Sequence, residues 1–183
     1  MQVKEEFSLK SEIFDWFEAI CFSLIALMLA LTLFVRTAQV DGSSMLPTLT
    51  HGDRLILVNS AITGVEKGDI VVITQPTEIG GPLIKRVIAT EGQTVDIDFN
   101  EGKVYVDGIL LEEPYINTLT TKVPIDSVEF PFTVSEGHVF VMGDNRNAST
   151  DSRSQSIGEI DTRYIIGKAF LRIFPFDTFG LVK

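Results

Sequence analysis

The chain has 183 residues and a formal net charge of −10, with a sequence pI near 4.6. This length suits one domain with a hydrophobic core rather than two. The acidic balance argues against nucleic acid as a partner and against electrostatic anchoring on anionic lipid, because both need a basic surface. Cys21 is the only cysteine, which excludes an intramolecular disulfide and a cysteine-based zinc site.

A long apolar run follows a short polar N-terminal segment. Residues 1–16 are polar and mixed in charge, whereas the run after them carries a single charge, Glu18. About 20 apolar residues can cross a hydrocarbon core of about 30 Å as a helix. Trp16 and Arg36 lie at the two ends of the run, where interfacial anchors belong. We therefore predict a transmembrane anchor over residues 17–36.

A cleaved signal peptide is the alternative interpretation of this run. The apolar region of a signal peptide has about 7–15 residues and follows a basic lead-in. Here the run is longer, and residues 1–16 include four acidic side chains, which favours a retained anchor. Basic residues lie near both ends of the run, so the positive-inside rule does not decide which side of the membrane the rest of the chain occupies.

The remainder of the chain, residues 37–183, reads as β structure. Short runs rich in Val and Ile alternate with turn signals, a pattern that predicts antiparallel sheets or a barrel. Asp107-Gly108 predicts a two-residue hairpin turn. The only helical turn expected lies near residues 156–161, and residues 109–136, which hold three prolines, are expected to form a β extension of the main sheet. The expected strands cover residues 54–58, 69–73, 83–88, 94–97, 103–106, 138–142 and 165–173.

Two serines, Ser43 and Ser44, lie in a turn-rich stretch shortly after the apolar run. A serine hydroxyl is a weak nucleophile and needs an adjacent base. The two histidines, His51 and His138, each adjoin a glycine in a turn-like setting, where a histidine is usually solvated. A Ser-His-Asp triad nevertheless stays open, because such triads occur in any chain order.

Lys85 is a second candidate base. It lies with Arg86 inside an apolar strand, and strand alternation directs the two side chains to opposite faces. A free lysine has a pKa near 10.4, but burial can lower it by up to about 3–5 units, so that the amine accepts a proton at neutral pH. Arginine effectively cannot lose its proton. The alternative is that both side chains are solubilising charges on an edge strand.

A polar stretch at residues 143–153 follows another apolar strand. Asp, Asn and Ser side chains bond to nearby backbone and build tight, ordered loops. The two Asp and two Arg of this stretch allow salt bridges within the loop or to Arg86. Polar loops on rigid strands are common places for functional sites, although a solvated turn has the same composition.

The apolar run, Ser-Met-Leu-Pro-Thr-Leu, Lys-Arg-Val-Ile-Ala and Gly-Asp-Asn-Arg-Asn-Ala-Ser-Thr-Asp-Ser-Arg, in this order, resemble the type I signal peptidase family of membrane-bound serine proteases. The likeness is greatest to bacterial members with a single N-terminal anchor. It implies a mainly β fold, with an antiparallel, SH3-like or barrel-like catalytic domain after the anchor. It also implies removal of signal peptides from exported preproteins, by cleavage after small residues of the Ala-x-Ala type. The implied place is the extracytoplasmic side of the cell membrane, with preproteins and membrane lipid as partners and without metal or cofactor.

The resemblance also implies roles for single residues. Ser44 matches the nucleophile of an acyl-enzyme mechanism, and Lys85 matches its general base. Gly42 stands where some members carry a serine that helps to hold the oxyanion, so the oxyanion is expected to rest on the backbone N–H of Ser44 and on a donor that the sequence does not reveal. The supporting residues implied are Ser149, which orients the lysine by a hydrogen bond, and two ion pairs, Asp151 with Arg153 and Asp144 with Arg86.

Matching to the family together with strand alternation predicts shallow apolar substrate pockets beside the nucleophile. The Phe-Pro-Phe segments at 130–132 and 174–176 are expected to pack in the core, with contact to the membrane interface as the alternative. The residues expected to line the pockets are Ala38, Val40, Met45, Leu49, Leu55, Leu83 and Ile84.

Two other classes of function share some of these features. Self-cleaving proteases of the SOS-repressor type also use a Ser/Lys dyad on a β fold, but they are soluble and usually carry a DNA-binding domain. The apolar run and the acidic charge argue against that class. The other alternative is a non-catalytic, membrane-tethered β module for binding. The oligomeric state is not indicated by the sequence.

Overall fold

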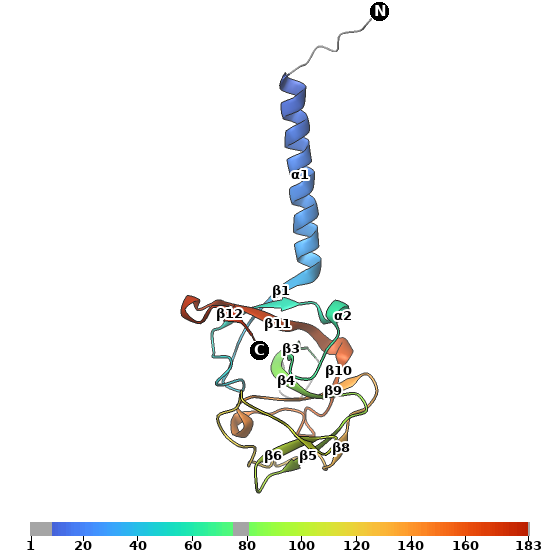
Figure 1. Cartoon of the computed structure of the whole chain (residues 1–183), viewed down its shortest axis with the longest axis vertical. Coiled ribbons are helices and arrows are strands. Elements are labelled where there is room, and N and C mark those ends of the chain that lie inside the picture. The colour runs from blue at the N-terminus through green and yellow to red at the C-terminus, as the bar shows by residue number, and fades with distance from the viewer. Residues whose placement is uncertain (1–8, 75–80, 183) are drawn as a thin grey trace, which may run out of the picture. The chain divides into compact units, whose positions relative to one another are not determined.

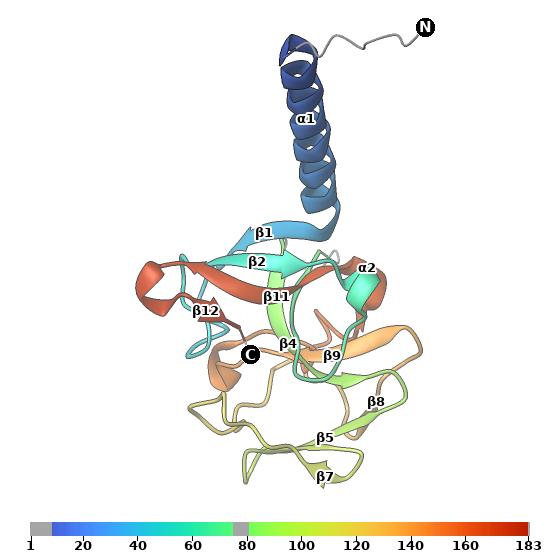
Figure 2. The same ribbon diagram turned by 45° about the horizontal axis from the view of Figure 1, so that its top comes forward.

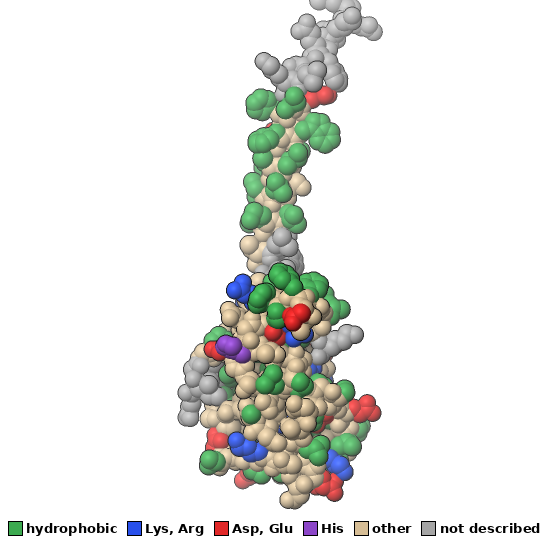
Figure 3. Space-filling model, turned by 90° about the vertical axis from the view of Figure 1, so that its left-hand side faces the viewer, with side chains coloured by type: hydrophobic (Ala, Val, Ile, Leu, Met, Phe, Trp, Pro, Cys, Tyr) green, Lys and Arg blue, Asp and Glu red, His purple; other side chains and the backbone are tan. Residues whose placement is uncertain are grey.

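The computed structural model describes residues 9–74 and 81–182, which fall into two compact units divided between Val35 and Arg36. The first unit holds helix α1, Leu9–Phe34, which begins eight residues before the predicted anchor. Large apolar side chains of this helix are exposed, and Figure 3 shows them along its visible face. Within the described residues, no helix meets the length and hydropathy required to cross a membrane.

The second unit is built of two antiparallel sheets (Figure 1). The main sheet has the order β1-β2-β11-β3-β4-β9-β10, with β12 paired to β11. The smaller sheet has the order β7-β6-β5-β8 and lies on the side of the unit away from β2 (Figure 2). The main-sheet strands are β1 Val35–Gln39, β2 Arg54–Val58, β3 Ile70–Ile73, β4 Leu83–Thr90, β9 His138–Met142, β10 Ile160–Asp161, β11 Ile165–Phe174 and β12 Gly180–Leu181. The strands of the smaller sheet are β5 Thr94–Asp98, β6 Lys103–Val106, β7 Ile109–Leu110 and β8 Phe132–Thr133.

The mainly β fold and the seven predicted strands are confirmed, each within two residues of its expected ends. The predicted hairpin is confirmed as well: Val106 pairs with Ile109, and Asp107 and Gly108 between them have φ angles of 53° and 76°. Positive φ at both central residues is the signature of a type I′ turn, which Asp-Gly adopts readily. Of the 109–136 segment, β7 and β8 join the smaller sheet, and Ser127 forms an isolated bridge with Ser154.

The prediction of a helical turn near residues 156–161 was wrong. Ile157 and Ile160 are both buried, and Ile160 pairs with Val139 of β9, so the segment ends in strand β10. Cross-strand pairing and burial decide this conformation, and local sequence does not report either. The short helices lie elsewhere, at α2 Ser60–Thr63, η1 Arg146–Ala148, η2 Thr162–Tyr164 and η3 Phe176–Thr178.

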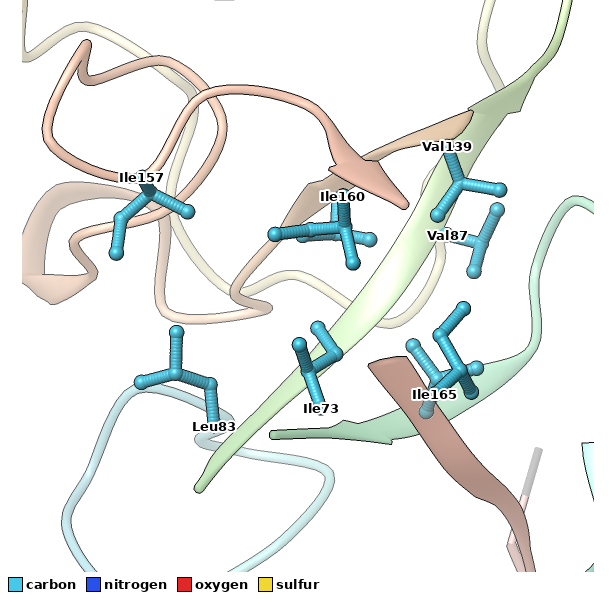
Figure 4. Packing of buried hydrophobic residues seen from close by; sticks show 9 residues of the cluster. Ile73, Leu83, Val87, Val139, Ile157, Ile160 and Ile165 are labelled. Carbon is cyan, nitrogen blue, oxygen red and sulfur yellow. The ribbon is translucent and has the colours of Figure 1, made fainter. Parts of the chain in front are cut away.

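Three apolar clusters form the core of the second unit. One lies between β3, β4, β9 and β11, where Ile73, Val87 and Ile165 are among the side chains in Figure 4. The second lies between the two sheets and includes Phe130 and Phe132, which contact the ring of Phe140. That segment therefore packs in the core, as predicted. The third cluster lies under the loop that carries the candidate serines and comprises Val40, Met45, Leu49, Leu55, Leu57, Ile70 and Val72.

Candidate active site

The loop after β1 holds Ser44 above the third core cluster. Met45 and Leu49 are almost fully buried, and the Leu49 N–H donates to the Met45 carbonyl at 2.9 Å. The loop is also tied to the turn before β2, because Val40 N–H donates to Asp53 O at 2.8 Å. The buried side chains of Met45 and Leu49, together with these backbone hydrogen bonds, thus fix the backbone around Ser44.

Strand β4 brings Lys85 to that hydroxyl. Its Nζ lies 2.8 Å from Ser44 Oγ, and the side chain is 3% exposed. Burial lowers the pKa of Lys85. The Asp151 carboxylate acts in the opposite direction, and the Arg153 guanidinium acts with burial. A buried amine with a lowered pKa is suited to accept a proton from the hydroxyl beside it.

Arg86 points to the other face of β4 and is also buried. Its Nε and Nη2 donate to the Asp144 carboxylate at 2.8 and 2.7 Å, so the expected ion pair is present as a two-bond contact. The Tyr115 ring stacks on the guanidinium, with its centroid 3.9 Å from Cζ. Because β4 is paired on both sides and both charges are buried, Lys85 and Arg86 are not edge-strand solubilising charges.

The 143–153 loop packs against the loop after β1 that carries Ser44, called the serine loop below, and is not a solvated turn. A Cβ on Gly143 would lie 2.5 Å from the Ser44 carbonyl oxygen, so only glycine fits at this point. Asn145 N–H donates to Ser44 O at 2.9 Å, and its side-chain amide donates to Ser43 O at 3.0 Å. The loop therefore holds both serine peptides in place through the backbone.

Asp151 and Arg153 form the other expected ion pair, at 2.7 Å between Oδ1 and Nε. Both side chains are about 1% exposed. Burial alone would raise the pKa of Asp151, but Arg153 and the Gly143 N–H outweigh it, and the net direction is downward. Asp151 is therefore held ionised beneath the lysine.

Ser149 does not make the hydrogen bond that was expected of it. Its buried Oγ forms no hydrogen bond of normal geometry with another described residue, although the hydroxyl lies near enough to Asp151 to help lower the pKa of that carboxyl. The hydroxyl packs against Gly143, while the Lys85 amine is directed to Ser44. The structure therefore brings Ser149 to the back of the site without connecting it to the lysine.

Comparison with known proteins decides the family. The family model described as "Signal peptidase, peptidase S26" matches residues 13–174. The chain belongs to this signal peptidase family. It is 40% identical over 169 residues to a probable signal peptidase I-1 of Synechocystis sp., covering 86% of this chain and 82% of the relative.

Other relatives carry related names. The chain is 32% identical over 175 residues to signal peptidase I of Bacillus licheniformis, with 92% of each chain covered. It is 31% identical over 186 residues to signal peptidase IB of Staphylococcus aureus strain COL, covering 93% of this chain and 94% of that one. A crystal structure of a signal peptidase I from Enterococcus faecalis is 28% identical, with a TM-score of 0.45, and the match covers 57% of this chain and 95% of that chain.

A cleft of about 420 Å³ opens beside Ser44 and Lys85, which both line it. Leu49 and Leu55 do not line it: each is at most 1% exposed and lies in the core cluster beneath. The family match and alternation could not separate the lining layer from the layer that supports it. Five expected residues do line the cleft, namely Ala38, Val40, Met45, Leu83 and Ile84, together with Thr37, Gln39, Val72, Pro82 and Ile166, which were not expected.

Neither histidine is hydrogen-bonded to Ser44 in the described structure. His138 begins β9, and its Nδ1 lies 2.8 Å from the Glu136 carbonyl oxygen, in a different groove. His51 lies beside the serine loop, where its Nδ1 is 3.3 Å from Gly42 N. Within the described residues, no group of three or more His, Cys, Asp or Glu side chains is arranged to hold a metal ion.

Two features of the site were not predicted. Asn145 was part of the polar stretch, but nothing in the sequence indicated that it clamps the peptides of Ser43 and Ser44. Tyr115 lies in the irregular segment after β7, and its contact with Arg86 had no sequence signal. Burial of its hydroxyl raises the pKa of Tyr115 to about 12.

Proposed function

We propose that this chain is a membrane-bound serine endopeptidase that removes signal peptides from exported preproteins, with Ser44 as nucleophile and Lys85 as general base. The observation that carries the proposal is the 2.8 Å contact between Lys85 Nζ and Ser44 Oγ, made by a lysine that is 3% exposed. Membership of the signal peptidase family supports it independently. No comparable contact supports a histidine base.

The mechanism is acyl transfer in two steps. Neutral Lys85 takes the proton of Ser44 as the serine oxygen attacks the scissile carbonyl. The lysine then protonates the leaving amine, and afterwards it activates the water that hydrolyses the acyl-enzyme. Each unit by which burial lowers the lysine pKa corresponds to about 1.4 kcal/mol of differential stabilisation of the neutral amine.

The Ser44 N–H is the proposed donor to the oxyanion. It makes no hydrogen bond to another described residue, so it is free to bind a substrate oxygen. Asn145 holds the carbonyls of Ser43 and Ser44, which fixes the direction of the adjacent peptide groups. A single oxyanion donor contributes about 3–4 kcal/mol to the transition state in well-studied serine proteases.

The cleft supports cleavage after small residues. Its walls include the side chains of Ala38, Leu83 and Ile84, which leave a shallow apolar space beside the nucleophile. Apolar walls of this kind suit a small apolar side chain such as that of alanine. We propose that these residues select the small side chains of an Ala-x-Ala site.

The proposed membrane anchor comprises residues 17–36, and the proposed catalytic domain comprises residues 37–183, on the extracytoplasmic side. Ser44 lies nine residues after Val35, so even an extended link of about 3.3 Å per residue keeps the nucleophile within about 30 Å of the end of the run. Phe174 and Phe176 are 45% and 80% exposed, so the second Phe-Pro-Phe segment does not pack in the core as predicted, and its exposure suits contact with the membrane interface. A preprotein whose signal segment lies in the bilayer would present its cleavage site at this height.

The test is cleavage of a preprotein with an Ala-x-Ala site by the purified, detergent-solubilised chain. Ser44→Ala and Lys85→Ala should each abolish cleavage, while Ser43→Ala, at the neighbouring serine, should retain it. Full activity of either of the first two variants would refute the dyad. Folded wild-type protein that cleaves no precursor would favour the binding module, and cleavage restricted to its own chain would favour the repressor-like class.

A further inference from the structure

Gly42 lies in an exposed part of the loop that carries Ser44. The residues from Asp41 to Ser43 are exposed, and Gly42 has φ of 96° with no atom within 4 Å of the place where a Cβ would be. Glycine is the most flexible residue of the chain backbone, and here no side chain restrains it. Gly42 lies two residues before Ser44, whose N–H is the proposed oxyanion donor, so the backbone conformation at Gly42 bears on the direction of that donor.

His51 supplies a restraint from the facing turn. Its Nδ1 lies 3.3 Å from the Gly42 nitrogen, and the geometry is that of an N–H donating to the ring nitrogen. The turn that carries His51 is rigid: Gly52 N–H donates to Val40 O at 2.9 Å. The buried Asp53 carboxylate of the same turn accepts from Thr50 N–H at 3.0 Å and from Arg172 at 2.9 Å. The His51 imidazole therefore links a hydrogen-bonded turn to Gly42, whose backbone has no side chain to restrain it.

The same ring nitrogen has a second partner with the opposite requirement. Asp41 Oδ1 lies 3.2 Å from Nδ1. The nitrogen can accept from Gly42 only when it carries no proton, and it can donate to Asp41 only when it is protonated. Asp41 is the charged group that faces the ring, because Asp53 is directed to Arg172.

We propose that His51 is a positioning residue for the loop that carries Ser44. Its unprotonated Nδ1 accepts a hydrogen bond from Gly42 N–H and so restrains the loop, and protonation of Nδ1 breaks that bond. The inference rests on the proposed Ser44/Lys85 function. It adds a second, histidine-dependent loss of activity on acidification, separate from protonation of Lys85. Because the bond is solvent-accessible, its loss should lower kcat by about 2- to 10-fold and leave KM nearly unchanged.

The test compares His51→Ala and His51→Asn with the wild type in preprotein cleavage. The asparagine side-chain oxygen can accept from Gly42 without titrating, so His51→Asn should restore most of the activity that His51→Ala loses. The ratio of wild-type to His51→Asn kcat/KM should fall about 2- to 10-fold between about pH 8.5 and pH 5.5.

His138→Asn is the matched control, since the chain has only one other histidine and it lies in a different groove. That variant should leave the pH dependence unchanged. A ratio that is constant with pH, or a fully active His51→Ala, would overturn the inference while inactive Ser44→Ala and Lys85→Ala left the dyad standing. The Gly42 amide resonance in NMR gives a readout that does not depend on catalysis: it should titrate with the His51 ring in the wild type and not in His51→Asn.

Discussion

Gly143→Ala should strongly lower activity by moving Ser44, the proposed nucleophile. The added Cβ would lie 2.5 Å from the Ser44 carbonyl oxygen and closer still to Ser149 Oγ. The Ser44 oxygen cannot move aside cheaply, because it is a backbone atom and is also held by Asn145 N–H. Overpacking of this kind typically costs about 1–3 kcal/mol of stability, and a misplacement of about 1 Å can cost about 100-fold in rate. We therefore expect kcat to fall by about 100-fold, with a modest loss of stability.

The measurement is preprotein cleavage together with thermal unfolding of the purified variant. Gly180→Ala is the matched control, because a Cβ there meets no atom within 4 Å and no positive φ is involved. It should retain wild-type activity and stability. Adding Ser149→Gly to Gly143→Ala would relieve the clash with the Ser149 side chain but not the clash with the Ser44 carbonyl oxygen. The double variant should therefore not regain full activity. A Gly143→Ala variant with wild-type kcat would refute the argument that this contact positions Ser44.

Three further outcomes follow from the buried charges. Lys85→Met should abolish cleavage but raise the free energy of unfolding near neutral pH. The pKa of Lys85 is lower in the folded chain than in the unfolded chain, so the unfolded chain binds more protons. The free energy of unfolding of the wild type should therefore rise with pH up to about 10.4. Arg86→Lys keeps the positive charge but should still cost about 1.5–3 kcal/mol in urea unfolding, because lysine cannot replace the two-bond contact with Asp144; an unchanged midpoint would contradict this. Arg153→Gln should move the acid limb of the pH–rate profile to higher pH, because Asp151 would then raise the Lys85 pKa without opposition; an unmoved limb would show that the pair does not act on the lysine.

Much of the fold was predictable from local sequence. The strands are short runs of Val and Ile between turn residues, and their ends were located within two residues. The Asp107-Gly108 turn was predictable because few dipeptides accept positive φ at two successive positions. The segment at 156–161 was not, since the burial of Ile157 and the pairing of Ile160 depend on β9, which is distant in the chain.

The site was predictable where the residue type carries the chemistry. Alternation required that Lys85 and Arg86 face opposite sides of one strand, and both side chains proved to be buried. Depth within the fold was not predictable: Leu49 and Met45 are both apolar and buried, yet only Met45 reaches the cleft. Contacts made through the backbone, such as those of Asn145, leave no trace in a single sequence.

The buried charges around Lys85 act on its pKa in opposite directions, and they also hold the neighbouring loops in place. A lysine can be kept neutral by burial alone, but a cavity lined only by apolar groups would not hold the loops that carry Ser44 and Gly143. Asp151 accepts from Gly143 N–H and so fixes that loop, at the cost of a negative charge that favours protonated lysine. Arg153 offsets this charge at 2.7 Å, and burial remains the largest influence on the lysine pKa. The ion pair thus holds the loop in place while the pKa of Lys85, the proposed base, stays below its ordinary value.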